Sequence, residues 1–125
     1  MLPAHHTGIA DSGSNGHYFS PDAPVANYNP QAPTVGVRVA NGCPKRSVAS
    51  ATLASATALP PAALSGHVMP IFPHTLIGLG PFANQDCMIV FTKTAVTVYR
   101  PDGHPILLGW RNETGPRLWH FPLTT

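Results

Sequence analysis

Proline and glycine are spread along the whole chain, and they restrict it to short secondary-structure elements. The 125 residues include 15 prolines and 11 glycines. Proline removes a backbone donor and clashes inside a helix, while glycine marks turns. The composition therefore excludes long helices and predicts a mostly β protein of short strands joined by turns. A chain of this length is expected to form one domain around one core.

The charged residues are few and scattered. They make up 10% of the chain, with seven basic and five acidic residues and a formal net charge of +2. Lys45 and Arg46 are the only adjacent basic pair, so nucleic-acid binding has little electrostatic support. His5 and His6 are adjacent in a polar segment, which is more typical of solvated side chains than of a metal site. We therefore expect no nucleic-acid partner, no metal and no cofactor.

Cysteine usage and hydropathy bear on the compartment. Cys43 and Cys87 are too far apart for a CxxC motif, so a reducing environment is the simpler interpretation. No apolar run approaches the ~20 residues that span a bilayer. Residues 1–6 lack the charged and apolar regions of a signal peptide. These features predict a soluble cytoplasmic protein without a membrane partner.

A period-two pattern predicts a hairpin in the first half of the chain. Val35, Val37 and Val39 alternate with smaller or polar residues, which indicates a strand with one apolar face. Asn41-Gly42 is a strong hairpin signal. We predict a hairpin over residues 34–53 with its tip at 41–45. Such an arm could close over a ligand, although most hairpins are only structural.

The remaining elements follow from the same signals. The predicted strands span residues 7–11, 67–72, 87–91, 94–99, 104–108 and 118–121, which with the hairpin makes about eight. A short helix is expected to begin near Pro81, where proline suits the first turn. Residues 20–33 and 109–115 are expected to be loops, and 87–91 a buried strand.

One carboxylate stands out by its setting. The strand at residues 7–10 leads directly to Asp11, which Ser12 and Gly13 follow. A carboxylate beside an apolar strand needs hydrogen-bond donors or a shared proton. Gly13 lets backbone amides approach the carboxylate, and the Ser12 hydroxyl can brace the turn. The tripeptide also suits an ordinary surface turn, so it identifies a candidate acid and no more.

The order of several motifs resembles the retropepsins, the retroviral-type aspartic proteases. Asp11-Ser12-Gly13 comes first, then the hairpin, then Leu76-Ile77-Gly78 with a short helix and an apolar strand. The chain is more similar still to proteases of Copia-type retrotransposon polyproteins. The shared features are Ser14 and His17 after the aspartate, Ala40-Asn41-Gly42, residues 73–82, and Gly109-Trp110-Arg111 leading to Leu118-Trp119.

The resemblance implies a fold, a function and a domain organisation. The fold would be a retropepsin-like closed β-barrel protomer with one short helix. Residues 1–6 would be a disordered N-terminus, 7–91 the protease domain, and 92–125 a C-terminal hairpin extension. The function would be an aspartic endopeptidase that processes its own polyprotein, located in the cytoplasm or in virus-like particles. Its partners would be a second copy of the chain and an extended polyprotein peptide.

The number of carboxylates that the reaction needs also requires a second copy of the chain. Peptide hydrolysis by aspartic proteases needs two carboxylates that share one proton. Of the five acids, only Asp11 stands in an apolar-Asp-Ser-Gly setting, so the second carboxylate must come from a symmetric homodimer.

The resemblance also implies roles for the site residues. Asp11 would be the catalytic acid or base, Ser12 would brace the active-site loops, and Gly13 would let the backbone approach substrate. Tyr18 and Phe19 are expected to cover the site. The predicted substrate-binding residues are Val37, Val39, Asn41, Gly42, Leu76, Ile77 and Gly78.

The sequence leaves two other functions open. One keeps the fold without catalysis, as a decayed or domesticated module for peptide binding or dimerisation. The other is a hydrolase with Ser12 or Cys43 as nucleophile beside a histidine. It has little support, because Ser12 lacks a nucleophile-elbow context and Cys43 precedes a proline in a turn.

Overall fold

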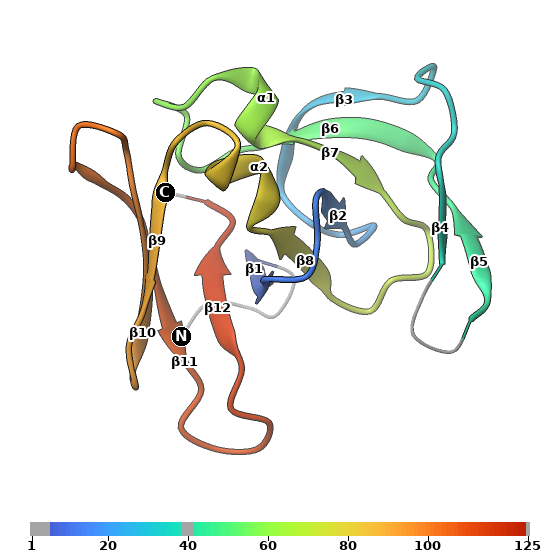
Figure 1. Ribbon diagram of the computed structural model, residues 1–125. Helices are drawn as coiled ribbons and strands as arrows, with labels where there is room; N and C mark the ends of the chain where they lie inside the picture. The colour runs from blue at the N-terminus through green and yellow to red at the C-terminus, as the bar shows by residue number, and fades with distance from the viewer. Residues whose placement is uncertain (1–5, 39–41, 125) are drawn as a thin grey trace.

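The computed structural model describes residues 6–38 and 42–124, and these residues form a mostly β protein (Figure 1). Its two short helices are α1, Pro61–Leu64, and α2, Gly80–Ala83. Its strands are β1 Thr7–Asp11, β2 His17–Phe19, β3 Val25–Asn29, β4 Gly36–Arg38, β5 Pro44–Arg46, β6 Ala49–Leu53, β7 Ser65–Val68, β8 Thr75–Gly78, β9 Met88–Phe91, β10 Ala95–Tyr99, β11 Pro105–Arg111 and β12 Trp119–Pro122.

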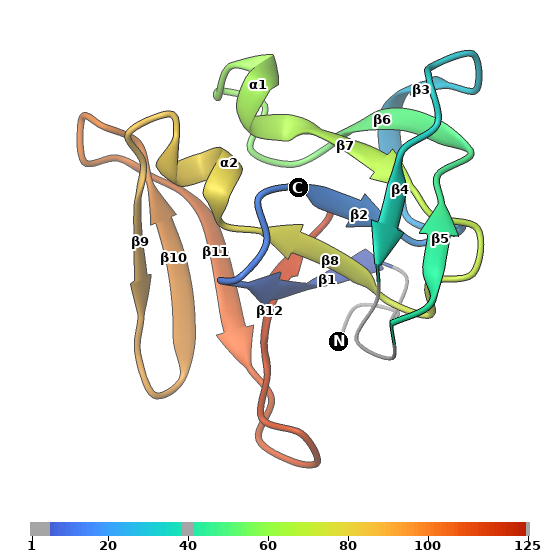
Figure 2. The same cartoon turned by 45° about the vertical axis from the view of Figure 1, so that its right-hand side comes forward.

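Ten of these strands form one bent sheet that is not closed into a barrel. Their order is β3-β6-β7-β2-β8-β1-β12-β11-β10-β9, and the other two strands, β4 and β5, pair only with each other. In the described residues β3 and β9 are the two edges of the sheet, and they lie on opposite sides of the molecule in Figure 2. The predicted closed barrel is therefore wrong, because the β9–β11 strands extend the sheet outward instead of returning to β3. The expectation of a single helix is wrong too.

The predicted hairpin is shorter than expected. β4 pairs with β5, with Gly36 opposite Arg46 and Arg38 opposite Pro44. Residues 49–53, expected to form its second arm, are β6 and pair with β3 and β7 in the large sheet. Their alternate side chains are buried, so apolar burial draws this strand into the core. The predicted loop at 20–33 is also wrong in part, since it contains β3.

The C-terminal strands complete the same sheet. Val96 and Val98 are fully buried, as the alternation predicts. β9 is less buried than expected, with Met88 57% exposed at the open edge. The expected loop at 109–115 begins as part of β11, because Gly109 leaves room for the carbonyl of His120 on the next strand. β12 lies between β1 and β11, so strands β10, β11 and β12 belong to the same sheet as β1 and β8.

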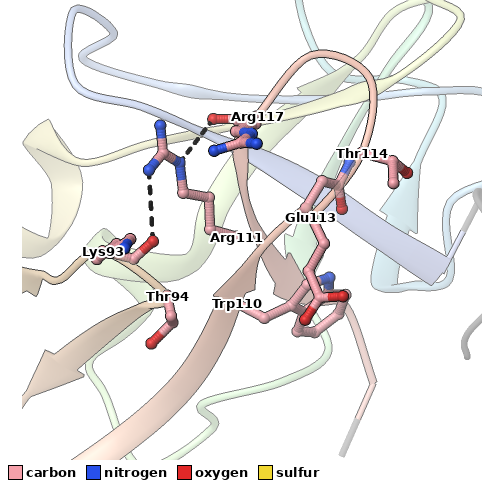
Figure 3. Close-up of a pocket in the computed structure, with 8 residues that line it drawn as sticks. Lys93, Thr94, Trp110, Arg111, Glu113, Thr114 and Arg117 are labelled. Atoms are coloured by element: carbon pink, nitrogen blue, oxygen red, sulfur yellow. Dashed lines mark hydrogen bonds between the residues drawn. The ribbon is translucent and has the colours of Figure 1, made fainter.

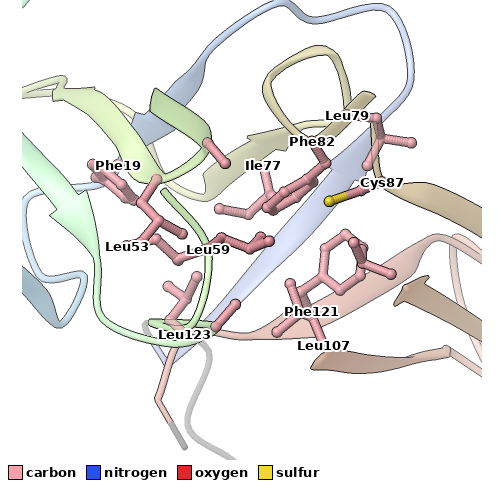
Figure 4. Packing of buried hydrophobic residues seen from close by; sticks show 14 of the residues in the cluster. Phe19, Leu53, Leu59, Ile77, Leu79, Phe82, Cys87, Leu107, Phe121 and Leu123 are labelled. Carbon is pink, nitrogen blue, oxygen red and sulfur yellow. The ribbon is translucent and has the colours of Figure 1, made fainter. Parts of the chain in front are cut away.

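One hydrophobic core connects the two halves of the sheet (Figure 4). Phe19 of β2, Ile77 of β8, and Phe121 of β12 are fully buried. Phe82 on α2 packs edge-on against Phe121, with ring centroids 6.3 Å apart. α2 has Pro81 in its first turn, as predicted. Neither helix of the described part of the chain is long and apolar enough to cross a bilayer.

Candidate functional site

The Asp11 carboxylate stands at the end of β1, beside the end of β8. The two strands are parallel, and Asp11 is opposite Gly78 in their register. Gly78 is buried, and a Cβ there would collide with the carbonyl oxygens of Gly16 and Ser14. A glycine at this position therefore lets the chain after Asp11 fold back directly over β8.

Backbone hydrogen bonds hold the loop after Asp11 in place. The amide of Gly13 donates to Oδ1 of Asp11 over 3.0 Å, which is the contact expected of an Asp-Ser-Gly turn. The amide of Leu79 donates to the Asp11 carbonyl at 3.2 Å, and that of Gly80 to the Ser14 carbonyl at 3.2 Å. The loop is thus bonded both to its own carboxylate and to the segment that enters α2.

An open pocket of about 480 Å³ lies over this loop. The β4–β5 hairpin contributes one wall of it through Val37 and Arg38. We call it the Asp11 pocket, and its full lining is Asp11, Gly13, Ser14, Asn15, Tyr18, Val37, Arg38, Phe72 and Leu76. The end of β1 with its Asp11 carboxylate, the loop that follows, and the β4–β5 hairpin therefore meet around one space. The lining residues are up to 65 positions apart in the sequence, as Asp11 and Leu76 are.

Only some of the predicted site residues line the Asp11 pocket. Asp11, Gly13, Val37 and Leu76 line the Asp11 pocket. Gly78 lies beneath the loop, and Ser12 and Gly42 are exposed outside the lining. Ile77 was expected to contact substrate, but its side chain is fully buried, because alternation along β8 turns it away from Leu76. Val39 and Asn41 lie outside the described residues.

Several lining residues were missed by the sequence analysis. Arg38 and Phe72 carried no motif that distinguished them, and they reach the pocket only through the hairpin and the turn after β7. Tyr18 was expected to cover the site, and it does line the pocket. Phe19 was expected to do the same but is fully buried in the core. The alternation of buried and half-buried residues along β2 explains the difference.

The histidine next to this loop is part of the core and does not reach the pocket. His17 is fully buried, and its Nε2 lies 2.7 Å from the carbonyl oxygen of Ala63, to which it can donate. Its Nδ1 has no hydrogen-bond partner among the described residues. Burial lowers the pKa of His17, and the bond to Ala63 only partly offsets this effect. The imidazole is therefore held neutral against Phe82.

A second, larger pocket of about 760 Å³ lies between the β9–β10 turn and the β11–β12 loop (Figure 3). We call it the Arg111 pocket, and sequence analysis did not identify it. Arg111 projects from the end of β11 and bonds two backbone carbonyls. The lining residues are Lys93, Thr94, Trp110, Arg111, Asn112, Glu113, Thr114 and Arg117.

The Asp11 pocket contains one carboxylate. None of the four other acids, all of which the structure describes, lines the Asp11 pocket. Within residues 6–38 and 42–124, no three side chains of His, Cys, Asp or Glu gather as metal ligands. No protein-family model matches the chain, and no curated protein matches it. Its function must therefore be argued from the geometry of the two pockets.

Proposed function

We propose that the protein is an aspartic endopeptidase that acts as a symmetric homodimer on an extended peptide. The observation that carries the proposal is the placement of Asp11 in an open pocket, on a glycine-supported loop, with a separate hairpin along one wall. This is the arrangement that a protease needs to hold a peptide above a carboxylate. The proposal extends the family resemblance of the Asp11-Ser12-Gly13 motif.

The second carboxylate of the reaction comes from a second copy. Among the residues that line the pocket in one chain, Asp11 is the only one with a carboxylate. A single carboxylate cannot act as base and acid at once. Ser12, Gly13 and Asn15 are exposed beside Asp11, so the loop is accessible to the same loop of a partner. In the dimer one Asp11 takes a proton from water, while the other donates its proton to the carbonyl oxygen of the scissile bond.

The hairpin supplies the other half of substrate binding. Within residues 6–38 and 42–124, β4 and β5 pair only with each other, so each strand has an edge that no other strand covers. Val37 and Arg38 line the pocket from this hairpin, and Leu76 lines it from β8. An extended peptide between them would bind by strand addition, with its side chains alternately toward and away from Leu76.

The test compares three forms of the protein in a peptidase assay. Wild type, Asp11→Asn and the matched control Asp22→Asn are incubated with peptides that have apolar residues at the scissile bond. The assay is run at about pH 5, close to the upper pKa of a carboxylate pair, so that part of the protein retains the shared proton. We expect cleavage by wild type and by Asp22→Asn, and a loss of at least about a hundredfold in Asp11→Asn. Asp22 is exposed and outside the pocket, which makes it a suitable control.

Concentration dependence tests the homodimer directly. Below the dissociation constant of the dimer, initial rate should rise with the square of protein concentration, and sedimentation should show the dimer appearing over the same range. Cleavage that is linear in protein concentration, or equal in wild type and Asp11→Asn, would contradict the proposal. Circular dichroism at the assay pH checks that each form is folded.

The second candidate is a peptide-binding module without catalysis. The observation that favours it is that the Asp11 pocket and its hairpin wall are complete within one chain. Such a module would bind the test peptides as a monomer with equal affinity in wild type and Asp11→Asn, and would not cleave them. Fluorescence anisotropy with labelled peptides distinguishes the two candidates.

A further inference from the structure

Four side chains form a row across neighbouring strands, and the row starts in the Asp11 pocket. Leu76 of β8 is opposite Ile9 of β1, which is opposite His120 of β12. His120 is in turn opposite Trp110 of β11, and the four strands are neighbours in the sheet (Figure 2). Residues that are opposite each other in paired strands point to the same face. We call these four residues, Leu76, Ile9, His120 and Trp110, the outer row.

The outer row lies on the face of the sheet that is opposite the core. Ile77 and Phe121, which follow Leu76 and His120 along their strands, are fully buried, whereas all four members of the row are half-buried. Successive side chains of a strand alternate between the two faces, so the row keeps accessible surface while its neighbours form the core. At its far end the rings of His120 and Trp110 are stacked, with centroids 6.3 Å apart and 18° between their planes. The row therefore ends in a flat aromatic surface.

The surface beyond the outer row is uncharged. All residues of strands β9 to β12 are described, and Arg111 is the only charged one among them. Its guanidinium lies over Trp119, on the other face of the sheet from Trp110, because consecutive residues of a strand alternate. Leu108, two residues before Trp110 and on the same face, is 65% exposed. An exposed sheet face without charges suits an apolar ligand.

The row is continuous with the space around the candidate carboxylate. Leu76 lines the Asp11 pocket, and Asp11 lies two residues beyond Ile9 on β1, on the same face. Neighbouring strands are about 4.8 Å apart, so the three steps from β8 to β11 span about 14 Å. An extended peptide advances about 3.3 Å per residue and would cover this distance with about four residues.

We propose that the outer row binds a flank of the peptide substrate and selects a flank of apolar and aromatic residues. The proposal rests on the proposed function, because that function places the bound peptide at Asp11. Apolar side chains of the flank gain by covering the row, whereas a charged one would lose hydration without finding a partner. In a symmetric homodimer each copy provides one row, so the preference applies on both sides of the scissile bond.

The test measures peptide binding by fluorescence anisotropy at about pH 7, where an unperturbed histidine is mostly neutral. It uses full-length protein with Asp11→Asn, so that the proposed reaction does not consume the peptide. Three labelled peptides are compared: a short peptide of apolar residues, the same peptide with four apolar or aromatic residues added at each end, and the same peptide with four Ser or Asn residues added at each end. We expect the apolar flanks to give at least about tenfold tighter binding than the polar flanks.

Variants of Trp110 locate the effect on the outer row. In the same background, Trp110→Ser should reduce the advantage of the apolar flanks at least about fivefold, and Trp110→Phe should restore most of it. Tyr28→Ser is the matched control, because Tyr28 is an aromatic residue, 56% exposed, on β3 at an edge of the sheet away from the row. It should leave the advantage unchanged. Affinity for the short peptide shows in each variant whether the Asp11 pocket is intact.

Three results would overturn the proposal. The first is no binding of the apolar-flank peptide, or equal affinity for apolar and polar flanks. The second is an equal effect of Trp110→Ser and Tyr28→Ser. The third is loss of the dimer in sedimentation of Trp110→Ser, because the outer row would then bind the second copy of the chain. The peptidase fails on a different result, equal cleavage by wild type and Asp11→Asn, so the two proposals can fail separately.

Discussion

The Asp11 pocket and the Arg111 pocket differ in how the chain builds them. The first joins the end of β1, the loop that follows it, and strands β2, β4 and β8 with the turn after β7. The second comes from residues 93–117, in the β9–β10 turn and the β11–β12 segment. The Asp11 pocket thus depends on long-range packing, whereas the Arg111 pocket depends on two neighbouring turns. Substitutions in the core should therefore affect the first more directly than the second.

Their charges differ as well. In the Asp11 pocket one carboxylate and one guanidinium, Arg38, line the same space. In the Arg111 pocket cations outnumber the carboxylate three to one. The first suits acid–base chemistry on a neutral peptide, and the second suits capture of an anion. The following predictions test whether the two pockets can be separated experimentally.

The largest effect is expected from Phe121→Ala. Phe121 is fully buried and contacts Phe82 in the core that joins the two halves of the sheet. Its truncation should lower the free energy of unfolding by about 3–5 kcal/mol. Leu118→Ala, at a position 42% exposed on the same C-terminal segment, should change it by less than about 0.5 kcal/mol. Urea denaturation followed by circular dichroism and by tryptophan fluorescence measures both. If the two signals of wild type do not coincide, the halves unfold separately and the single-core description fails.

Gly78→Ala should damage the Asp11 pocket selectively. The new Cβ would meet the carbonyls of Gly16 and Ser14, which are backbone atoms and cannot rotate away. We expect a loss of about 1–3 kcal/mol in unfolding free energy, together with loss of peptidase activity. Gly36→Ala is the matched control, because nothing lies within 4 Å of the position that its new methyl group would occupy. The intrinsic fluorescence of Trp110 and Trp119, both at the Arg111 pocket, should be unchanged in Gly78→Ala protein that remains folded, and a change would show that the pockets are coupled.

Acid should destabilise the fold through His17. Because burial holds the folded-state pKa of His17 below its ordinary value, the unfolded chain binds the proton first as the pH falls. The stabilisation is therefore complete above about pH 6.5 and is lost below it, by up to about 1.4 kcal/mol per pH unit. His17→Gln keeps a donor for Ala63 and should flatten this dependence in thermal melts between about pH 7.5 and 5, the range that matters for the peptidase assay.

His120 is the comparison for this pH effect. Its pKa is lowered by burial and then by His74, but the side chain is only half-buried. His120→Gln should therefore flatten the pH dependence less than His17→Gln. The reverse order would mean that the C-terminal half, and not the Asp11 side, limits stability in acid.

The smallest effect is expected from Arg111→Lys on stability. The substitution keeps the charge but weakens the stacking on Trp119 and cannot reproduce both bonds to Arg117 and Lys93. We expect a loss of about 0.5–1 kcal/mol, measured by urea denaturation. Arg117→Lys, at a side chain that forms no hydrogen bond within the described residues, should cost less. If Arg111→Lys costs nothing, the guanidinium is not held rigidly, and the preorganisation of the Arg111 pocket is in doubt.

The sequence predicted single strands better than their pairing. The alternation around Val96 and Val98 and the strand that ends at Asp11 are found as predicted. Residues 49–53 were assigned to the wrong partner, because a local pattern shows that a strand has a buried face but not which neighbour covers it. The same limit explains why Arg38 and Phe72 were missed: no local signal places them beside Asp11.

By itself the sequence determined that the elements are short, that a turn with Gly13 follows Asp11, and that one candidate acid is present. These are local properties, set by backbone conformation and by the period of apolar residues. Only the tertiary structure decided that the sheet stays open, that Ile77 points into the core, and that Lys93, Arg111 and Arg117 share one pocket. Those outcomes depend on which surfaces, far apart in the chain, bury each other. The hydrophobic effect is non-directional, so a local pattern of apolar residues does not show which surface will cover it.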